Sequence, residues 1–184
     1  PSGPGIIWDE DILEIAREVP PPISIFLLTS ETNSQGIVEH HKRCHTSTIQ
    51  IVDELKDKNY QAIRGALPFV KIVQVVHILD ESSIDEALEL SESVDAVLLD
   101  SGNPNLDVKE LGGTGRTHNW DLSRKIVDQC KKPVFLAGGL KPENVREAIE
   151  RVQPFGLDLC SGVRTDRKLD LHKLEKFFSE VEKA

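Results

Sequence analysis

The stretch Pro133–Gly162, PVFLAGGLKPENVREAIERVQPFGLDLCSG, contains a complete strand–helix–strand unit. Two short apolar runs, PVFLAGG and GLDLCSG, flank a segment whose apolar residues recur at helical spacing, with Pro142 suited to the first helical turn. Near-continuous apolar strands joined by an amphipathic helix are typical of a parallel sheet covered by helices. The stretch therefore predicts an α/β fold.

The same pattern repeats along the chain. Apolar, β-branched runs begin near six positions, namely Ile23, Thr48, Lys71, Asp95, Pro133 and Gly156. Successive starts are 25, 23, 24, 38 and 23 residues apart, and a period of about 24 residues favours a (β/α)8 TIM barrel. Because six βα units are visible where a barrel has eight, we expect residues 1–184 to form a single, partial barrel domain. The first strand, first helix and second strand are the parts expected to be missing, and an open, doubly wound six-stranded sheet is the alternative.

Three helices are predicted with enough detail to be checked individually. The first spans about Asp9 to Glu18. In another, Ser82 and Ser83 with the acidic residues after them predict a capping box. The tail, residues 170–184, predicts an amphipathic closing helix. Its apolar residues are all expected to pack inward: Leu174, Phe177, Phe178 and Val181.

Composition limits the class of partner. A net charge of −9 argues against nucleic acid or an anionic membrane surface, although helix ends and loops on an acidic protein still bind small anions. No apolar run approaches the roughly 20 residues that span a bilayer. The three cysteines form no C-x-x-C pair, which favours reduced thiols and a cytoplasmic protein. The sequence allows an oligomer.

Asp100 is the first candidate for chemistry. It ends the apolar run DAVLLD and precedes the 38-residue step, which adds about 14 residues to the usual spacing, including the GGTGR segment Gly112–Arg116. A carboxylate at the C-terminal tip of a parallel strand, beside a long loop, is how barrel enzymes present an acid to a substrate. The simpler alternative is that Asp100 caps a turn and that the glycines permit sharp bends.

Two further loops predict a phosphate site. One strand ends in Gly138 and Gly139 just before a helix, and the next is followed by Ser161 and Gly162. Glycines allow close backbone approach, and the loops after the last two strands of a barrel frequently bind phosphate together. Ordinary βα turn chemistry is the competing interpretation.

Several motifs in this order resemble phosphoribosylanthranilate isomerase of tryptophan biosynthesis: LLDS, GGTGRTHNW, PVFLAGGL-PENV and GLDLCSGVR. The resemblance is strong from about Leu67 to the C-terminus and weaker from Ile12 to Leu55. It implies a (β/α)8 barrel isomerase that performs an Amadori rearrangement on a phosphorylated aminoaldose without a cofactor or a metal.

The resemblance also implies residue roles. Asp100 would be the general acid that opens the furanose ring. Asp158, with Gly112, Gly113, Gly115 and Arg116, would bind the substrate. Gly138, Gly139, Ser161 and Gly162 would bind its phosphate. The family's base is a cysteine near the end of the first strand, and no residue of this chain inherits that role.

The chain departs from the family pattern at several positions. Gln50-Ile51-Val52-Asp53 stands where Gln-Leu-His-Gly is common, Arg116 replaces a lysine, Asn119 an acid, and Arg164 a glutamate. Arg164 would either strengthen phosphate binding or face solvent. These changes motivate a second hypothesis, a phosphosugar-binding barrel that has lost catalysis. A third hypothesis is isomerisation of the histidine-pathway aminoaldose. That substrate carries two phosphates, and the earlier units show no second phosphate loop, which disfavours this hypothesis.

Three other features carry less weight. The run His40–His45, HHKRCH, is rich in metal-binding side chains, but it precedes a strand and adjacent residues do not converge on one ion, so no metal site is expected. His77 near a strand end is a possible active-site group, although a hydrogen-bonded neutral histidine is the simpler interpretation. Cys160 is expected to be a small buried side chain rather than a substitute base.

Overall fold

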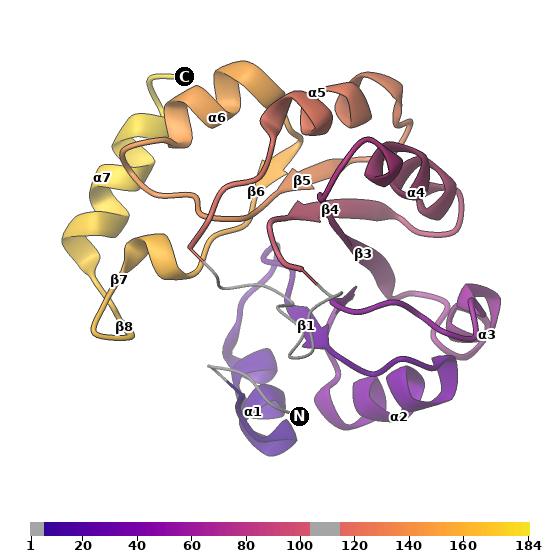
Figure 1. Ribbon diagram of the computed structural model, residues 1–184. Coiled ribbons are helices and arrows are strands. Elements are labelled where there is room, and N and C mark those ends of the chain that lie inside the picture. The colour runs from indigo at the N-terminus through magenta and orange to yellow at the C-terminus, as the bar shows by residue number, and fades with distance from the viewer. Residues whose placement is uncertain (1–5, 104–114) are drawn as a thin grey trace. The chain divides into compact units, whose positions relative to one another are not determined.

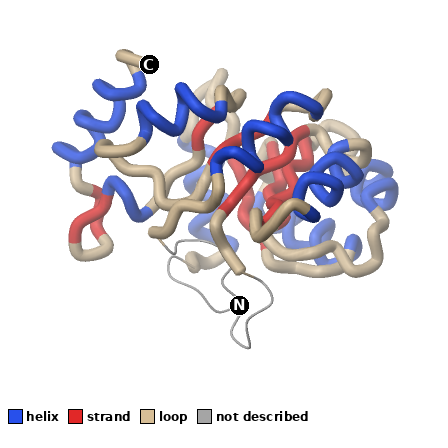
Figure 2. The backbone as a smooth tube through the Cα atoms, turned by 45° about the horizontal axis from the view of Figure 1, so that its top comes forward, coloured by secondary structure: helices blue, strands red, loops and turns tan. Residues whose placement is uncertain are grey.

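The computed structural model describes residues 6–103 and 115–184, and it contains two compact units. The first unit comprises the chain up to Val75 together with Ser93–Asp95, and the second comprises Val76–Glu92 and the chain from Ala96 onward. Strands alternate with helices throughout (Figures 1 and 2). The expectation of a single domain stays a prediction.

The first unit holds three parallel strands and three helices. In chain order they are α1 (Asp9–Glu18), β1 (Phe26–Thr29), α2 (Ser34–Cys44), β2 (Thr48–Ile51), α3 (Tyr60–Ala66) and β3 (Lys71–His77), whose last two residues belong to the second unit. Thr48 of β2 pairs with Phe26 on one side and with Lys71 on the other. The predicted helix at Asp9–Glu18 is confirmed by α1.

The second unit continues the alternation. Its elements are α4 (Ser82–Ser91), β4 (Ala96–Asp100), α5 (Trp120–Gln129), β5 (Val134–Leu136), α6 (Val145–Val152), β6 (Gly156–Leu157), a 3₁₀ turn η1 (Ser161–Val163), the two-stranded hairpin β7 (Arg164–Thr165) and β8 (Lys168–Leu169), and α7 (Leu171–Val181). Strands β4, β5 and β6 are parallel, with Leu99 opposite Leu136 and Leu136 opposite Leu157. The hairpin next to α7 is antiparallel.

The predicted α/β class with six parallel strands is confirmed. In each unit the strands pair in chain order, as in a βα barrel, whereas a doubly wound sheet reverses its order at a switch point. Every residue of β2 and β4 is buried, which explains the apolar run Ala96–Leu99 of β4, whereas β2 also buries the polar Thr48 and Gln50. Fully buried side chains such as Ile49 in the first unit and Leu99 in the second form the cores, and each stabilises its unit by roughly 1.5–3 kcal/mol.

Two local predictions about helices are wrong. Helix α4 has no capping box, because the Asp80 carboxylate takes that place and accepts hydrogen bonds from the Ser82 backbone N–H at 2.8 Å and from its hydroxyl at 2.6 Å. In α7, Phe177 is buried but Phe178 is 56% exposed. A step of one residue turns a side chain about 100° around a helix, so Phe178 lies outside the stripe that contains Phe177.

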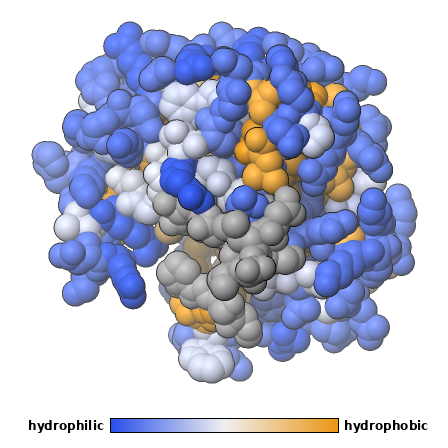
Figure 3. All heavy atoms as spheres, viewed as in Figure 1, coloured by the Kyte–Doolittle hydropathy of each residue, from blue (hydrophilic) through white to orange (hydrophobic). Residues whose placement is uncertain are grey.

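Polar side chains cover most of the face seen in Figure 3, and the apolar residues on it form smaller patches. Among the described residues no helix is both long enough and apolar enough to cross a membrane.

Candidate active site

Asp100 is the buried carboxylate at the C-terminal end of β4. The Ser101 backbone N–H donates to its Oδ1 at 2.7 Å, and its own carbonyl accepts from the Ile78 N–H at 2.9 Å. Burial raises the pKa of Asp100, and this outweighs the opposing effects of the Ser101 hydrogen bond and of the nearby His77. A raised pKa favours the protonated carboxyl group, which is the form that a general acid needs.

Asp158 is the second carboxylate of the site. Its N–H donates to the Leu136 carbonyl at 2.9 Å, which extends the pairing of β5 with β6 by one residue. The surrounding protein desolvates the carboxyl group and raises its pKa, and the negative charge of Asp100 raises it further. The charge of Asp100 therefore acts on the Asp158 carboxyl group, although the Asp158 residue as a whole is exposed.

The loop after β5 touches both the end of β4 and the segment that precedes α5. A Cβ atom on Gly138 would come within 2.9 Å of the Ser101 backbone nitrogen, beside Asp100. A Cβ on Gly139 would lie 2.5 Å from the Arg116 carbonyl carbon, and Gly139 also has a φ of +62°. At Gly138 the nearest atom is the Ser101 Oγ at 2.7 Å and φ is +84°, whereas the close contacts at Gly139 are all with backbone, so glycine is favoured at both positions. The predicted glycine loop thus packs against Ser101, the residue that follows Asp100.

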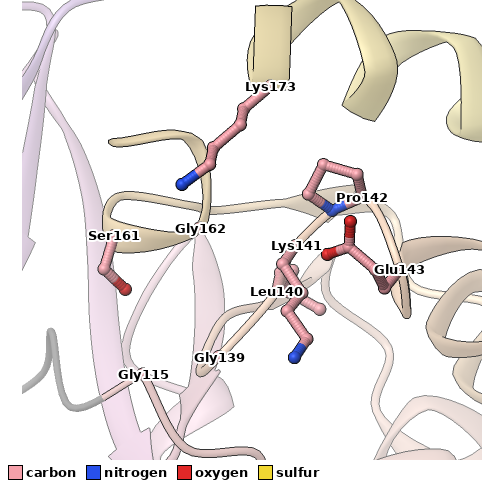
Figure 4. Close-up of a pocket in the computed structure, with 9 residues that line it drawn as sticks. All are labelled: Gly115, Gly139, Leu140, Lys141, Pro142, Glu143, Ser161, Gly162 and Lys173. Atoms are coloured by element: carbon pink, nitrogen blue, oxygen red, sulfur yellow. The ribbon is translucent and has the colours of Figure 1, made fainter. Parts of the chain in front are cut away.

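The loops after β5 and β6 also meet each other. At Gly162 a Cβ would collide with the carbonyl oxygen of Leu140 and lie 3.1 Å from the Lys141 Cα. The two loops enclose a cavity of about 280 Å³ (Figure 4). It is lined by Gly115, Gly139, Leu140, Lys141, Pro142, Glu143, Ser161, Gly162 and Lys173. The sequence therefore located the two loops that form this cavity.

The cavity has the donors and charges of an anion site. In the described part of the chain, the backbone N–H groups of Gly139 and Leu140 donate no hydrogen bond. Two lysines, Lys141 and Lys173, are among the lining residues, and Figure 4 shows the Lys173 side chain extending toward the Ser161–Gly162 loop. Free backbone N–H groups combined with lysine charge favour a phosphate-sized anion.

Neighbouring residues fix this arrangement. The Asn144 side chain accepts from the Lys141 N–H at 2.9 Å and donates to the Gly139 carbonyl at 3.0 Å, which closes the loop on itself. The Lys173 ammonium donates to the Arg164 carbonyl at 2.9 Å. Glu143, the only acidic residue lining the cavity among the described residues, pairs with Lys176 at 2.8 Å, so part of its negative charge is offset.

The predicted loop residues differ in their relation to the cavity, and Asp100 and Asp158 are not among its lining residues. Gly115, Gly139, Ser161 and Gly162 line the cavity, and Gly138 lies one residue away from it. Arg116 contributes backbone beneath Gly139 but is not among the lining residues. Gly112 and Gly113 lie outside the described residues.

Sequence reasoning missed Lys141, Lys173 and Asn144. The sequence held a signal for both lysines. Lys141 lies within four residues of the Gly138–Gly139 loop, and Lys173 lies in the first turn of α7, the helix that follows the Ser161–Gly162 loop. Arg164 is exposed, and its guanidinium donates to the Arg167 carbonyl at 3.2 Å rather than lining the cavity. Cys160 is exposed, so the expectation that it is buried is wrong, because the strand ends before it at Leu157.

His118 lies in the segment that leads into α5, and it makes the protein sensitive to acid. Its Nε2 hydrogen-bonds the buried Ser123 hydroxyl at 2.7 Å, and burial lowers its pKa to about 4. Because the unfolded chain binds this proton near pH 6.5 and the folded chain does not, stability is lost as the pH falls from about 6.5 toward 4. We expect this residue alone to destabilise the fold by about 2 kcal/mol between pH 7 and 4.5.

Urea unfolding at both pH values tests this expectation in the wild type and in His118→Phe. The variant is expected to lose about 2 kcal/mol less on acidification than the wild type. The carboxylates titrate equally in both proteins. An identical loss of stability in the wild type and in His118→Phe would therefore show that His118 is not the cause.

Comparisons with known proteins agree with this geometry. Residues 5–180 match the family model for N-(5'-phosphoribosyl)anthranilate (PRA) isomerase. The N-(5'-phosphoribosyl)anthranilate isomerase of Methanosarcina acetivorans is 38% identical over 170 residues, which cover 86% of this chain and 69% of that protein.

Solved structures give the same fold. The phosphoribosyl anthranilate isomerase of Thermococcus kodakaraensis superposes with a TM-score of 0.77 at 26% identity, covering 100% of this chain and 85% of that one. Another solved phosphoribosyl anthranilate isomerase, in complex with reduced 1-(o-carboxyphenylamino)-1-deoxyribulose 5-phosphate, gives a TM-score of 0.74 at 23% identity. It covers 97% of this chain and 81% of that one.

Proposed function

Because this chain belongs to the N-(5'-phosphoribosyl)anthranilate isomerase family, we propose that it contributes the acid and the phosphate site for an Amadori rearrangement in tryptophan biosynthesis. The substrate is N-(5-phosphoribosyl)anthranilate, and the product is 1-(2-carboxyphenylamino)-1-deoxyribulose 5-phosphate. The observation that carries the proposal is the buried Asp100 carboxyl group, whose pKa is raised, in the same unit as the cavity between the two glycine loops.

Asp100 acts first in this proposal. Its carboxyl proton passes to the furanose ring oxygen as the bond from that oxygen to C1 breaks, and the anthranilate nitrogen lone pair forms an iminium with C1. Burial keeps the Asp100 pKa high enough to hold that proton, and the carboxylate left behind faces a positive iminium. General acids in such steps contribute about 10²–10⁴-fold in rate.

The remaining steps move protons and need no external oxidant. A base removes the proton on C2, and the electron pair forms a C1–C2 double bond while the iminium nitrogen becomes neutral. The resulting enol then tautomerises to the ketone: C1 gains a proton, the C2 hydroxyl loses one, and the C1–C2 double bond is replaced by the carbonyl at C2. One carbon is oxidised and its neighbour reduced, so the reaction balances within the substrate. We assign no residue among these 184 to the base.

The cavity between the glycine loops holds the phosphate in this proposal. The free N–H groups of Gly139 and Leu140 would donate to phosphate oxygens, and the ammonium groups of Lys141 and Lys173 would offset its charge. Asp158, next to Asp100, would orient polar groups of the substrate. With its phosphate held in this cavity, the substrate would have its ring oxygen positioned beside Asp100.

Genetic complementation tests the proposed activity. The complete gene product should restore growth without tryptophan to bacteria whose phosphoribosylanthranilate isomerase gene is deleted. Bacteria that lack the corresponding histidine-pathway isomerase should not be rescued. Rescue of the histidine strain alone would contradict the proposal. Expression without any rescue, combined with measurable phosphosugar binding, would favour the non-catalytic barrel instead.

A further inference from the structure

Three side chains of the first unit bring metal-ligating atoms together where the sequence suggested none. They are Asp9 at the start of α1, and His40 and Cys44 one turn apart on α2. A carboxylate oxygen, an imidazole nitrogen and the Cys44 sulfur all lie within 4.8 Å of one another. Adjacent histidines of the HHKRCH run do not converge on one point. His40 and Cys44, which are four residues apart in that run, do converge, and α1 supplies Asp9 as the third donor.

We propose that Asp9, His40 and Cys44 bind a zinc-class divalent cation. Zinc takes carboxylate oxygen, imidazole nitrogen and thiolate sulfur, and it often has three protein ligands with water in the fourth position. Donor atoms in a tetrahedral zinc site lie roughly 3.5 Å apart, which follows from bond lengths of about 2.0–2.3 Å. The Asp9 Oδ1 and His40 Nε2 atoms already lie 3.2 Å apart, close to that spacing.

The second ring nitrogen of His40 is already oriented as in a metal site. Its Nδ1 lies 2.9 Å from the Thr29 hydroxyl, and its Nε2 lies 3.2 Å from Asp9 Oδ1. Metal-bound histidines almost always have their other nitrogen hydrogen-bonded in this way, which fixes the ring and the tautomer. Thr29 is buried, so its hydroxyl holds His40 Nε2 toward Asp9.

The surroundings carry charges of both signs. Arg43 holds Asp9 Oδ2 and leaves Oδ1 directed at His40, and its own positive charge opposes a cation there. Glu10 and Asp11 follow Asp9 in the first turn of α1 and add negative charge. Cys44 is fully buried, whereas Asp9 and His40 are partly accessible, so an ion would enter from their side.

The ion would add a link between two helices that already pack together and share the Asp9 ion pairs. Helix α1 has no fully buried residue and no side-chain cap at its N-terminus, although it packs against α2. A metal that takes one ligand from α1 and two from α2 would fix that pairing. The proposed function does not depend on this site, because all three ligands belong to the first unit.

Titration of the metal-free, reduced protein with Co²⁺ tests the proposal directly. We expect one equivalent to give the near-ultraviolet absorption of a cobalt–thiolate bond and the visible bands of a tetrahedral site, and Zn²⁺ to displace it. Cys44→Ser should abolish the thiolate band, and Asp9→Asn should weaken binding at least tenfold. Thr29→Val keeps all three ligands and should weaken binding by about 10- to 100-fold.

Matched variants separate this site from adventitious binding. Cys160→Ser removes an exposed thiol, and His45→Asn removes a neighbouring histidine whose φ of +54° asparagine tolerates. Both should bind Co²⁺ like the wild type. Circular dichroism checks that Cys44→Ser folds, and the partly exposed Asp9 gives an independent test if it does not. No stoichiometric cobalt spectrum, or equal loss of the spectrum in Cys160→Ser, would overturn the proposal.

Discussion

Replacing Asp100 with asparagine is expected to lower kcat for phosphoribosyl anthranilate by about 10²–10⁴-fold, with KM nearly unchanged. The amide matches the carboxyl group in shape but cannot transfer a proton to the ring oxygen. Because the cavity that we propose for the phosphate is lined by other residues, substrate affinity should survive. Steady-state kinetics on both proteins measures the effect, and Asp85→Asn, an exposed carboxylate on α4, serves as the matched control.

The stability of the same variant separates a catalytic role from a structural one. Burial raises the pKa of Asp100 in the folded state, so the wild type loses stability as the pH rises from the unfolded pKa toward the folded one. Asp100→Asn removes that charge and should unfold at an equal or higher urea concentration at pH 7. A variant that loses both activity and stability would show that Asp100 mainly supports the fold, contrary to the proposal.

Gly162→Ala has the second large expected effect. The new Cβ would collide with the Leu140 carbonyl oxygen and would lie 2.9 Å from the Leu140 carbonyl carbon, both backbone atoms. The loop after β6 must then move away from the loop after β5, which widens the phosphate cavity and costs about 1–3 kcal/mol of stability. Misplacement near 1 Å costs as much as 10²-fold in an active site. We therefore expect KM to rise at least tenfold, together with the Ki of inorganic phosphate as a competitive inhibitor.

Gly65→Ala is the matched glycine control. Gly65 lies in α3, and a Cβ built on it has no neighbour within 4 Å. Alanine should therefore raise the free energy of unfolding by about 0.5–1 kcal/mol through helix propensity, without changing KM. If both glycine variants affect KM equally, the close contact at Gly162 does not position the phosphate site.

The fold was largely predictable from the sequence because parallel strands leave a strong pattern. Strand β4 is buried throughout and begins with four apolar residues, Ala96–Leu99, and the helices between strands show helical spacing. The position of Asp100 followed from the same pattern, since a strand end is visible where an apolar run stops at a charge. The two glycine loops were also predictable, because turns and close backbone contacts restrict the residue type.

The features that sequence reasoning missed depend on tertiary contacts. The position of Lys173 in the first turn of a helix was a weak signal, but its contact with the cavity beside Gly162 depends on how α7 packs. The capping of α4 by Asp80 and the outward position of Phe178 depend on helix start and rotation, which periodicity fixes only to within a residue or two. The meeting of Asp9 with His40 and Cys44 likewise requires the packing of α1 on α2.

The central claim is that Asp100 and the cavity between the glycine loops belong to an isomerase site. The most direct measurement is the decay of anthranilate-type fluorescence when the complete gene product is mixed with freshly made phosphoribosyl anthranilate. The account predicts decay at a rate proportional to enzyme concentration, with the deoxyribulose phosphate as product, and little decay with Asp100→Asn. Undiminished turnover by Asp100→Asn, or no turnover by a folded protein that binds the reduced product analogue, would contradict it.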